Sequence, residues 1–258
     1  MTEDLAGRVI LISGATGGFG EVAAKSLAAS GARLVLTDLD PDGLEWLATS
    51  LDTDCATLSG DVTDPELAKH CLGLAIERFG QLDGAFNNAG IEHPVVRQPE
   101  IDRPTFDKII AVNLLGVHAA MQAQLPYFYT RFKETGETGS ILNTASIAGV
   151  AGAPKLSVYS AAKHGVVGLS RSAALEYAGR GVRVNCLCPC FFKTPMVMNS
   201  IIKGFPSEAE GLRAMASGIP MGRIGEPEEI VPAVHFALSP ANSFFTGQEI
   251  RLDGGMTS

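Results

Sequence analysis

The sequence predicts an α/β fold in which helices cover both faces of a parallel sheet. Short β-rich apolar runs alternate with longer helical segments along most of the 258 residues, and a glycine-rich turn joins the first run to the first helix. A chain of this length with this alternation fits a single large domain. Parallel strands joined by helices cross over right-handed, and such sheets bind ligands at the carboxyl ends of their strands.

Each element is predicted from apolar periodicity bounded by turn residues. Seven strands are expected near 8–13, 33–37, 55–60, 83–87, 139–145, 182–188 and 248–252. Helices are expected near 18–30, 41–51, 65–79, 104–131, 157–179 and 227–238. The stretch 191–221 mixes apolar residues with the breakers Gly204 and Pro206, and long irregular inserts are often lids. We expect one domain, residues 1–258, with a substrate lid at about 191–221.

Composition excludes several classes of protein. The net charge is −8 and no basic stripe occurs, which argues against a nucleic-acid partner. We expect that no apolar segment approaches the length needed to cross a membrane and that no basic-then-apolar leader opens the chain. Cys186, Cys188 and Cys190 alternate in one apparent strand without a His or carboxylate cluster, so we expect no metal site. Reduced thiols in a cytoplasmic protein are the simpler account.

A dinucleotide site is predicted where the first strand meets the first helix. The turn from Gly14 to Gly20 lets backbone amides approach a pyrophosphate at the positive end of the helix. The second strand ends in Asp38, whose carboxylate can accept hydrogen bonds from the adenosine ribose and would repel a 2′-phosphate. No Arg or Lys stands at 37–42 to neutralise such a phosphate. NAD is therefore favoured over NADP.

A reactive site is predicted from Tyr159 and Lys163. Their spacing of four puts both side chains on one helix face. A cation beside a phenol favours the phenolate and lowers the pKa of the tyrosine, so the pair can act as an acid/base device. Two surface residues can also meet in this way by chance. Ser146, at the end of an apolar run, and the glycine turn favour the reactive site.

In this order and spacing, the residues resemble the short-chain dehydrogenase/reductase family, in its compact single-domain branch with a Rossmann fold. The likeness covers essentially the entire chain. It rests on Gly14-x-x-x-Gly18-x-Gly20, Asp61-Val62, Asn87-Asn88-Ala89-Gly90, Asn113, Ser146, Tyr159-x-x-x-Lys163, Pro189 with Thr194, and Asp253-Gly254-Gly255. The glycines also fit the longer sugar-nucleotide epimerase branch, but 258 residues leave little room for its additional substrate domain.

Two residues depart from the family pattern. Ser13 stands where the family usually has Thr and keeps a hydroxyl. Cys190 stands where a Gly usually follows Pro189. A residue with a side chain disfavours positive φ at this position. Two interpretations are open: a small residue packed at a strand end, or a thiol that shapes the substrate cleft.

The resemblance implies four catalytic residues: Asn113, Ser146, Tyr159 and Lys163. Tyr159 would exchange a proton with the substrate oxygen while hydride moves between carbon and nicotinamide. Lys163 would lower the tyrosine pKa and bind the nicotinamide ribose, and Ser146 would orient the substrate oxygen. Asn113 would hold a water in a proton relay behind the lysine; a structural role in bending its helix is the alternative.

The cofactor residues implied by the resemblance lie along the carboxyl ends of the strands. Asp61 would take the adenine amino group beside Val62, or it would cap the following helix. Thr194, with backbone from Phe192, would bind the carboxamide. The full set is Gly14, Thr16, Gly18, Phe19, Gly20, Asp38, Leu39, Asp61, Val62, Asn87, Ala89, Gly90, Tyr159, Lys163, Pro189, Phe192 and Thr194.

The predicted substrate cleft is mostly apolar, which suits a hydrophobic or cyclic secondary alcohol. Its lining is expected to include the lid and Ile91, Glu92, His93, Ile147, Ala148, Val150 and Ala151. We expect no catalytic role for His93, because Tyr159 already serves as the acid/base group. Contact of Glu92 with a polar substrate group is left open.

The sequence therefore predicts an NAD-dependent oxidoreductase that interconverts a small-molecule secondary alcohol and its ketone. The alternatives are an NADPH-dependent ketone or 3-oxoacyl reductase and an inactive NAD-binding regulator. A homotetramer is expected by resemblance. Small residues beyond one buried stripe on 104–131 and 157–179 support it mildly (Ala119, Ala120, Ala123, Ala173 and Ala174).

Overall fold

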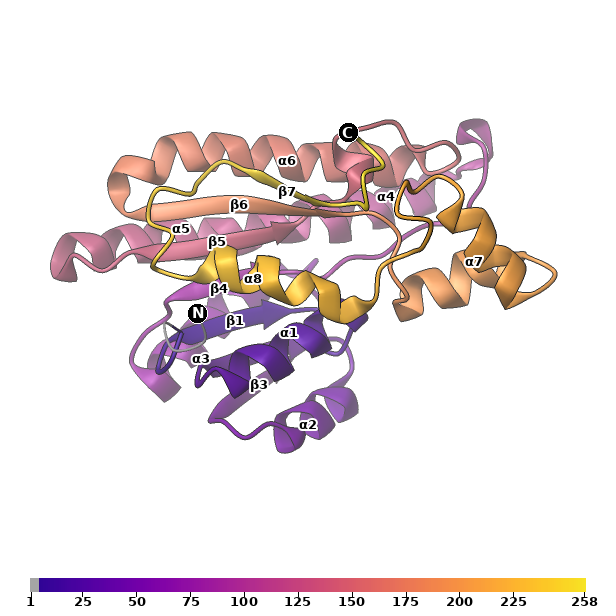
Figure 1. Ribbon diagram of the computed structural model, residues 1–258. Coiled ribbons are helices and arrows are strands. Elements are labelled where there is room, and N and C mark those ends of the chain that lie inside the picture. The colour runs from indigo at the N-terminus through magenta and orange to yellow at the C-terminus, as the bar shows by residue number, and fades with distance from the viewer. Residues whose placement is uncertain (1–4) are drawn as a thin grey trace.

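Seven parallel strands form one sheet in a computed structural model that describes residues 5–258, apart from the side chain of Ile201 (Figure 1). The strand order is β3-β2-β1-β4-β5-β6-β7, so the chain reverses direction across the sheet between β1 and β4. The predicted doubly wound sheet is confirmed. The strands are β1 (Val9–Ser13), β2 (Arg33–Asp38), β3 (Cys55–Ser59), β4 (Gly84–Asn87), β5 (Gly139–Thr144), β6 (Val182–Pro189) and β7 (Glu249–Leu252).

Helices cover the sheet in two layers (Figure 1). One layer contains α1 (Gly18–Ala29), α2 (Pro41–Ser50) and α8 (Val231–Leu238); the other contains α3 (Pro65–Phe79), α5 (Gly116–Thr135) and α6 (Ser157–Tyr177). Alternate residues of one strand enter opposite cores. Ile10 and Ile12 pack with the first layer, whereas Val9 and Leu11 pack with the second. Burial on both faces explains the continuous apolar runs of the strands.

Aspartate caps set several helix starts where the sequence places them. The side chain of Asp40 accepts from the Gly43 N–H, and that of Asp64 accepts from the Glu66 N–H. A proline follows each cap, where its missing N–H costs no helix bond. At the other end, Gly80 adopts the left-handed conformation that terminates α3.

The predicted helix 104–131 is interrupted and longer than expected. It consists of α4 (Arg103–Ile110), a π-turn η2 (Ala111–Leu115) and α5, which ends at Thr135. The run 103–135 has the length and composition of a membrane span, so the expectation that no segment approaches one is wrong on those criteria. Several of its apolar residues pack in the core against the sheet (Val117, Met121, Leu125 and Phe128). Arg131 pairs with the buried Asp83 and Gln124 bonds Asn87, which docks the helix on the sheet.

The stretch 191–221 contains more regular structure than predicted. It includes η5 (Val197–Ile201), η6 (Ile202–Gly204) and α7 (Glu208–Ala216), a helix that the sequence analysis missed. Ser207 caps α7 by accepting from the Glu210 N–H. These elements stand beyond the carboxyl ends of the strands, at the right of Figure 1. A bridge between Phe192 and Gly225 joins the start of the stretch to the segment that follows it.

Candidate active site

A cleft of about 540 Å³ lies at the carboxyl ends of β1, β2, β4, β5 and β6. This is the edge where doubly wound sheets bind ligands, and the volume is that of a small-molecule site. Of the residues predicted for cofactor binding and catalysis, only Gly20, Asn87 and Asn113 lie outside its lining. The structure thus brings together, in one cleft, groups that are up to 180 residues apart between Gly14 and Thr194.

The glycine turn leaves bare backbone facing the cleft. Gly14 has a φ of 65°, and a Cβ there would lie 2.8 Å from the Cα of Ala89. A Cβ on Gly20 would collide with the carbonyl oxygen of Gly14, so Gly20 acts by packing beneath the turn rather than by lining the cleft. The helix that begins at Gly18 has no side-chain cap. Its first N–H groups are therefore suited to an anion such as a pyrophosphate.

Asp38 organises the same end of the cleft. One carboxylate oxygen accepts from the Thr16 N–H (2.9 Å) and the other from the Leu39 N–H (2.7 Å). Each oxygen keeps a second acceptor position that can serve a hydroxyl of a ligand. Leu39 is 67% exposed beside it and offers an apolar face. The carboxylate therefore has the surroundings that a ribose–adenine site requires.

Asp61 lines the cleft but does not cap the next helix. Its Oδ1 accepts from the Thr63 N–H at 2.9 Å, which shapes the short loop. The cap of α3 is Asp64, so the alternative that Asp61 serves as the helix cap is wrong.

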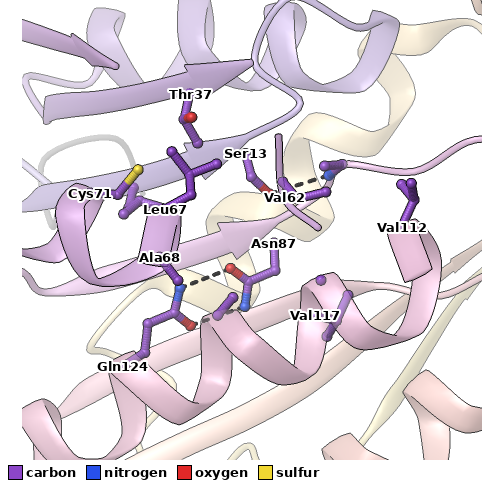
Figure 2. A pocket seen from close by; sticks show the side chains of 14 residues that line it. Ser13, Thr37, Val62, Leu67, Ala68, Cys71, Asn87, Val112, Val117 and Gln124 are labelled. Atoms are coloured by element: carbon purple, nitrogen blue, oxygen red, sulfur yellow. Dashed lines mark hydrogen bonds between the residues drawn. The ribbon is translucent and has the colours of Figure 1, made fainter. Parts of the chain in front are cut away.

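The side chain of Asn87 points away from the cleft into a separate cavity of about 30 Å³ (Figure 2). Figure 2 shows its amide in a reciprocal pair with Gln124 of α5, with N···O distances of 3.0 and 2.9 Å. A third bond joins it to Asn143 at 2.8 Å. Only the backbone of Asn87 is therefore left to approach a ligand. No local sequence pattern indicates this triad, because its members come from three distant elements.

Tyr159 and Ser146 meet inside the cleft. Burial raises the pKa of Tyr159 to about 12 and outweighs a hydrogen bond from Ser146, which lowers that pKa. Ser146 is itself fixed, since its Oγ accepts from the Ala148 N–H (3.1 Å) and lies 3.5 Å from the carbonyl oxygen of Pro189. A nearby negative charge on Glu92 raises the tyrosine pKa further.

Lys163 is almost completely buried behind Tyr159. Its Nζ donates to the carbonyl oxygen of Thr144 (2.7 Å) and lies 5.6 Å from the centroid of the tyrosine ring. Burial lowers the pKa of Lys163 to about 8. Desolvation is the largest cause of the pKa shift at both groups, and a lowering of the tyrosine pKa by the lysine stays a prediction. The geometric pairing of the two side chains on one helix face is present.

Asn113 acts on the loop that follows β4. It is fully buried in the π-turn, its Oδ1 accepts from the Ile91 N–H (2.8 Å), and its Nδ2 donates to the Ile91 carbonyl (2.7 Å). Both halves of the amide are therefore used to hold the backbone beside the cleft. This positioning role was not foreseen, and a water relay at Asn113 stays a prediction.

The substrate end of the cleft differs in part from its prediction. Ile91, Glu92, Ile147 and Ala148 line it, whereas Val150, Ala151 and His93 do not. His93 is buried, and its Nδ1 lies 2.7 Å from the Pro94 carbonyl oxygen. Among the described side chains of 191–221, only Phe191, Phe192 and Thr194–Val197 line the cleft. Sequence reasoning missed Lys108, Ala153 and Leu156, which no local pattern marks.

The three alternating cysteines have separate environments. Cys186 and Cys188 are buried in the core beneath α6, whereas the half-buried Cys190 lines the cleft. Burial raises the pKa of the Cys190 thiol. Among residues 5–258, Lys155 alone of the non-glycine residues has a positive φ, so the backbone at 190 does not require glycine. No group of three or more metal-ligating side chains occurs among the described residues.

Comparison with known proteins identifies the family of this chain. A family model described as enoyl-(acyl carrier protein) reductase matches residues 14–257. Levodione reductase of Leifsonia aquatica is 37% identical over 97% of this chain and 94% of its own length. A 2,5-dichloro-2,5-cyclohexadiene-1,4-diol dehydrogenase of Sphingobium indicum is 36% identical over 99% of both chains. Cyclohexanol dehydrogenase of an Acinetobacter strain is 36% identical over 100% of this chain and 98% of its own.

Solved structures agree with the sequence matches. The crystal structure of levodione reductase superposes with a TM-score of 0.91 and 36% identity, covering 97% of this chain and 98% of that one. A 3-ketoacyl-(acyl-carrier-protein) reductase from Brucella melitensis, complexed with NADH, has a TM-score of 0.90 and 31% identity, covering 98% of this chain and 100% of the other. These matches span almost the whole chain. It therefore belongs to the short-chain dehydrogenase/reductase family of oxidoreductases.

Proposed function

We propose that this protein is an NAD-dependent oxidoreductase that interconverts a secondary alcohol and its ketone by hydride transfer. One observation carries the proposal: a single cleft holds Asp38 and the uncapped start of α1 at one end and the Ser146–Tyr159 pair at the other. Two relatives are named for cyclic alcohols, which supports a cyclic and largely apolar substrate. The apolar lining of the substrate end, beside Ser146 and Tyr159, suits such a molecule.

The nucleotide end of the cleft fits NAD. The glycine turn has no space for side chains at Gly14, which favours close approach of a pyrophosphate to the backbone. The carboxylate of Asp38 favours free ribose hydroxyls over a 2′-phosphate. A relative was crystallised with NADH, which supports the same class of cofactor. When bound, the nicotinamide would accept or supply the hydride, and its oxidised form would add a positive charge.

Tyr159 exchanges the proton in this proposal. Because burial raises its pKa to about 12, Tyr159 is a protonated phenol at neutral pH and is ready to donate to a ketone oxygen. In the oxidative direction the phenol would first have to lose its own proton, and the resulting phenolate would take the proton of the alcohol. The positive charge of an oxidised nicotinamide would favour that ionisation. Ser146 orients the same oxygen. Lys163, whose pKa is about 8, can hold or release a proton near neutral pH.

A second candidate is an NADPH-dependent 3-oxoacyl reductase. Its support is the description of the matching family model and the likeness to the Brucella reductase. Asp38 counts against NADPH, since its carboxylate would lie close to the added phosphate.

We also propose a homotetramer, as members of the family commonly form. Large apolar side chains are exposed on the helical run and on α6, among them Leu115 (53%) and Leu175 (86%). Phe244, near β7, is fully exposed. These side chains would be buried if the elements that carry them pack against another copy of the chain. Light scattering on the purified protein measures the assembly directly.

The test of the proposed activity is a spectrophotometric screen for nicotinamide reduction. Purified protein would be mixed with NAD, and separately NADP, and with a panel of cyclic, aromatic, steroidal and sugar secondary alcohols. Turnover with NAD on an apolar cyclic member is the expected result. A clear preference for NADP would contradict the role given to Asp38 and favour the second candidate.

A further inference from the structure

Glu92 is a carboxyl group in an apolar part of the active-site cleft. It lines the substrate end together with Ile147, Ala148 and Leu156. Its Oε1 is buried and makes no hydrogen bond with any residue in the described part of the chain. An oxygen in this state costs free energy in the folded protein, because it has lost water without gaining a partner. The arrangement is explained if a ligand supplies that partner.

The backbone next to Glu92 is held in place. Asn113 bonds both the N–H and the carbonyl of the preceding residue, Ile91, and it does so from the interior of the helix layer. The carboxyl group therefore projects from a fixed part of the loop after β4. A site that binds an oxygen atom by hydrogen bonds needs such fixed geometry.

No cation neutralises the carboxyl group. Two lysines line the cleft, but no ion pair joins either Lys108 or Lys163 to Glu92 among the described residues. Burial alone raises the pKa of Glu92 to about 7. A large fraction is thus the neutral acid at neutral pH. A neutral carboxyl group donates one hydrogen bond and accepts others, so it can bind either a hydroxyl or a carbonyl group.

We propose that Glu92 binds a second oxygen of the substrate, so that the preferred substrates are diols, hydroxyketones or diketones rather than simple alcohols. This inference rests on the proposed function, in which Tyr159 and Ser146 take the reacting oxygen. Glu92 and Tyr159 line the same cleft, so one small molecule can reach both. The Sphingobium relative is named for a cyclic 1,4-diol, which fits this arrangement.

A cationic ligand is the competing explanation for a lone carboxyl group. An ammonium group would bind the ionised carboxylate, whereas the neutral acid suits an uncharged oxygen. The two explanations differ in what Glu92→Gln does. Glutamine keeps an N–H donor and a carbonyl acceptor but never carries a charge.

The test compares cyclohexane-1,4-diol with cyclohexanol in the wild type, Glu92→Gln and Glu92→Leu. The measured quantity is the ratio of kcat/KM for the diol to that for cyclohexanol, corrected for the two hydroxyl groups of the diol. We expect the wild type to favour the diol about tenfold, and Glu92→Leu to lose about tenfold in this ratio through a higher KM for the diol. Glu92→Gln should keep the ratio within about threefold.

The control is Glu100→Leu, on the same loop but exposed and outside the cleft, which should leave the ratio unchanged. Thermal melting and NAD binding establish that each variant is folded. An unchanged ratio in Glu92→Leu overturns the inference while leaving the proposed function intact. A loss in Glu92→Gln as large as in Glu92→Leu also overturns it, in favour of a charged contact. If the wild type oxidises neither alcohol with NAD or NADP, the proposed function fails as well.

Discussion

The two ends of the cleft differ in how their polar groups are satisfied. At the nucleotide end, both oxygens of Asp38 accept hydrogen bonds from backbone N–H groups, and bare backbone at Gly14 forms the surface. At the substrate end, Glu92 keeps a buried oxygen that bonds no residue between 5 and 258 as far as these are described, and Leu156 and Lys108 come from separate segments. The polar groups of the nucleotide end are thus held in place by backbone contacts before any ligand binds. The shape and polarity of the substrate end depend on side chains, so substitutions there can change which substrates bind.

The largest expected effect lies between the two ends, at Tyr159. Tyr159→Phe should lower kcat about 10²–10⁴-fold, because the proton exchange with the substrate oxygen is lost. Binding of NAD should be nearly unchanged, since the hydroxyl belongs to the substrate side of the site. Initial rates and a fluorescence titration with NADH measure the two quantities. Retention of more than about a tenth of the wild-type rate contradicts the role of Tyr159.

A substitution in the glycine turn should lower both the folding stability and the nucleotide affinity, because the turn has one fixed backbone conformation. Gly14→Ala forces a side chain into a left-handed position and against Ala89, which should cost about 1–3 kcal/mol of folding stability and weaken nucleotide binding. Gly73→Ala, inside α3 with open space around it, is the matched control and should stabilise by about 0.5–1 kcal/mol. Urea denaturation measures both. Equal effects of the two changes would show that the turn is not rigid.

A substitution of Asp38 tests which nucleotide the nucleotide end of the cleft prefers. Asp38→Ser removes the charge that opposes a 2′-phosphate and weakens contacts to the ribose. The ratio of kcat/KM for NAD to that for NADP should fall about 10–100-fold, the worth of one or two hydrogen bonds to a charged group. Initial rates with each nucleotide give the ratio. If it does not move, the selection lies elsewhere in the cleft.

The smallest expected effect is a change in stability with pH at the substrate end. The folded-state pKa of Glu92 is raised from 4.5 to about 7, so between these values the folded state binds more protons than the unfolded state. This contribution to stability is present below pH 4.5 and is lost as the pH rises through 7. The variant Glu92→Gln has no carboxyl group at this position, so its free energy of unfolding does not fall for this reason as the pH rises.

The free energy of unfolding of Glu92→Gln, relative to the wild type, should therefore increase by about 1–2 kcal/mol between pH 4.5 and pH 8, allowing for partial exposure. Urea denaturation across this range measures the difference. Glu100→Gln, at an exposed site on the same loop, is the control. A difference that does not depend on pH would mean that Glu92 is solvated like a surface carboxylate.

The nucleotide end was predictable because its signals are local. Glycine spacing, a strand that ends in Asp38, and the Tyr159–Lys163 spacing are each contained in a short stretch of sequence. The doubly wound parallel sheet followed from the alternation of strands and helices, whereas its strand order comes from the structure. Each of these features depends on backbone conformation more than on distant partners.

The rest depended on packing between distant elements. The side chain of Asn87 is turned inward by Gln124 and Asn143, and the clamp of Asn113 on Ile91 joins a helix to a loop. The direction in which the pKa of Tyr159 shifts depends on how deeply the ring is buried, and the spacing between Tyr159 and Lys163 does not reveal that burial. The helix α7 was missed because breakers surround a short apolar pattern.

The most direct test of the account is transfer of deuterium from a labelled alcohol. The protein would be incubated with NAD and cyclohexane-1,4-diol deuterated at the carbinol carbons, and the nucleotide analysed by mass spectrometry. Hydride transfer predicts that one deuterium appears in the reduced nicotinamide with the wild type, and that almost none appears with Tyr159→Phe. Reduced nucleotide without deuterium, or equal transfer by both proteins, would contradict the mechanism.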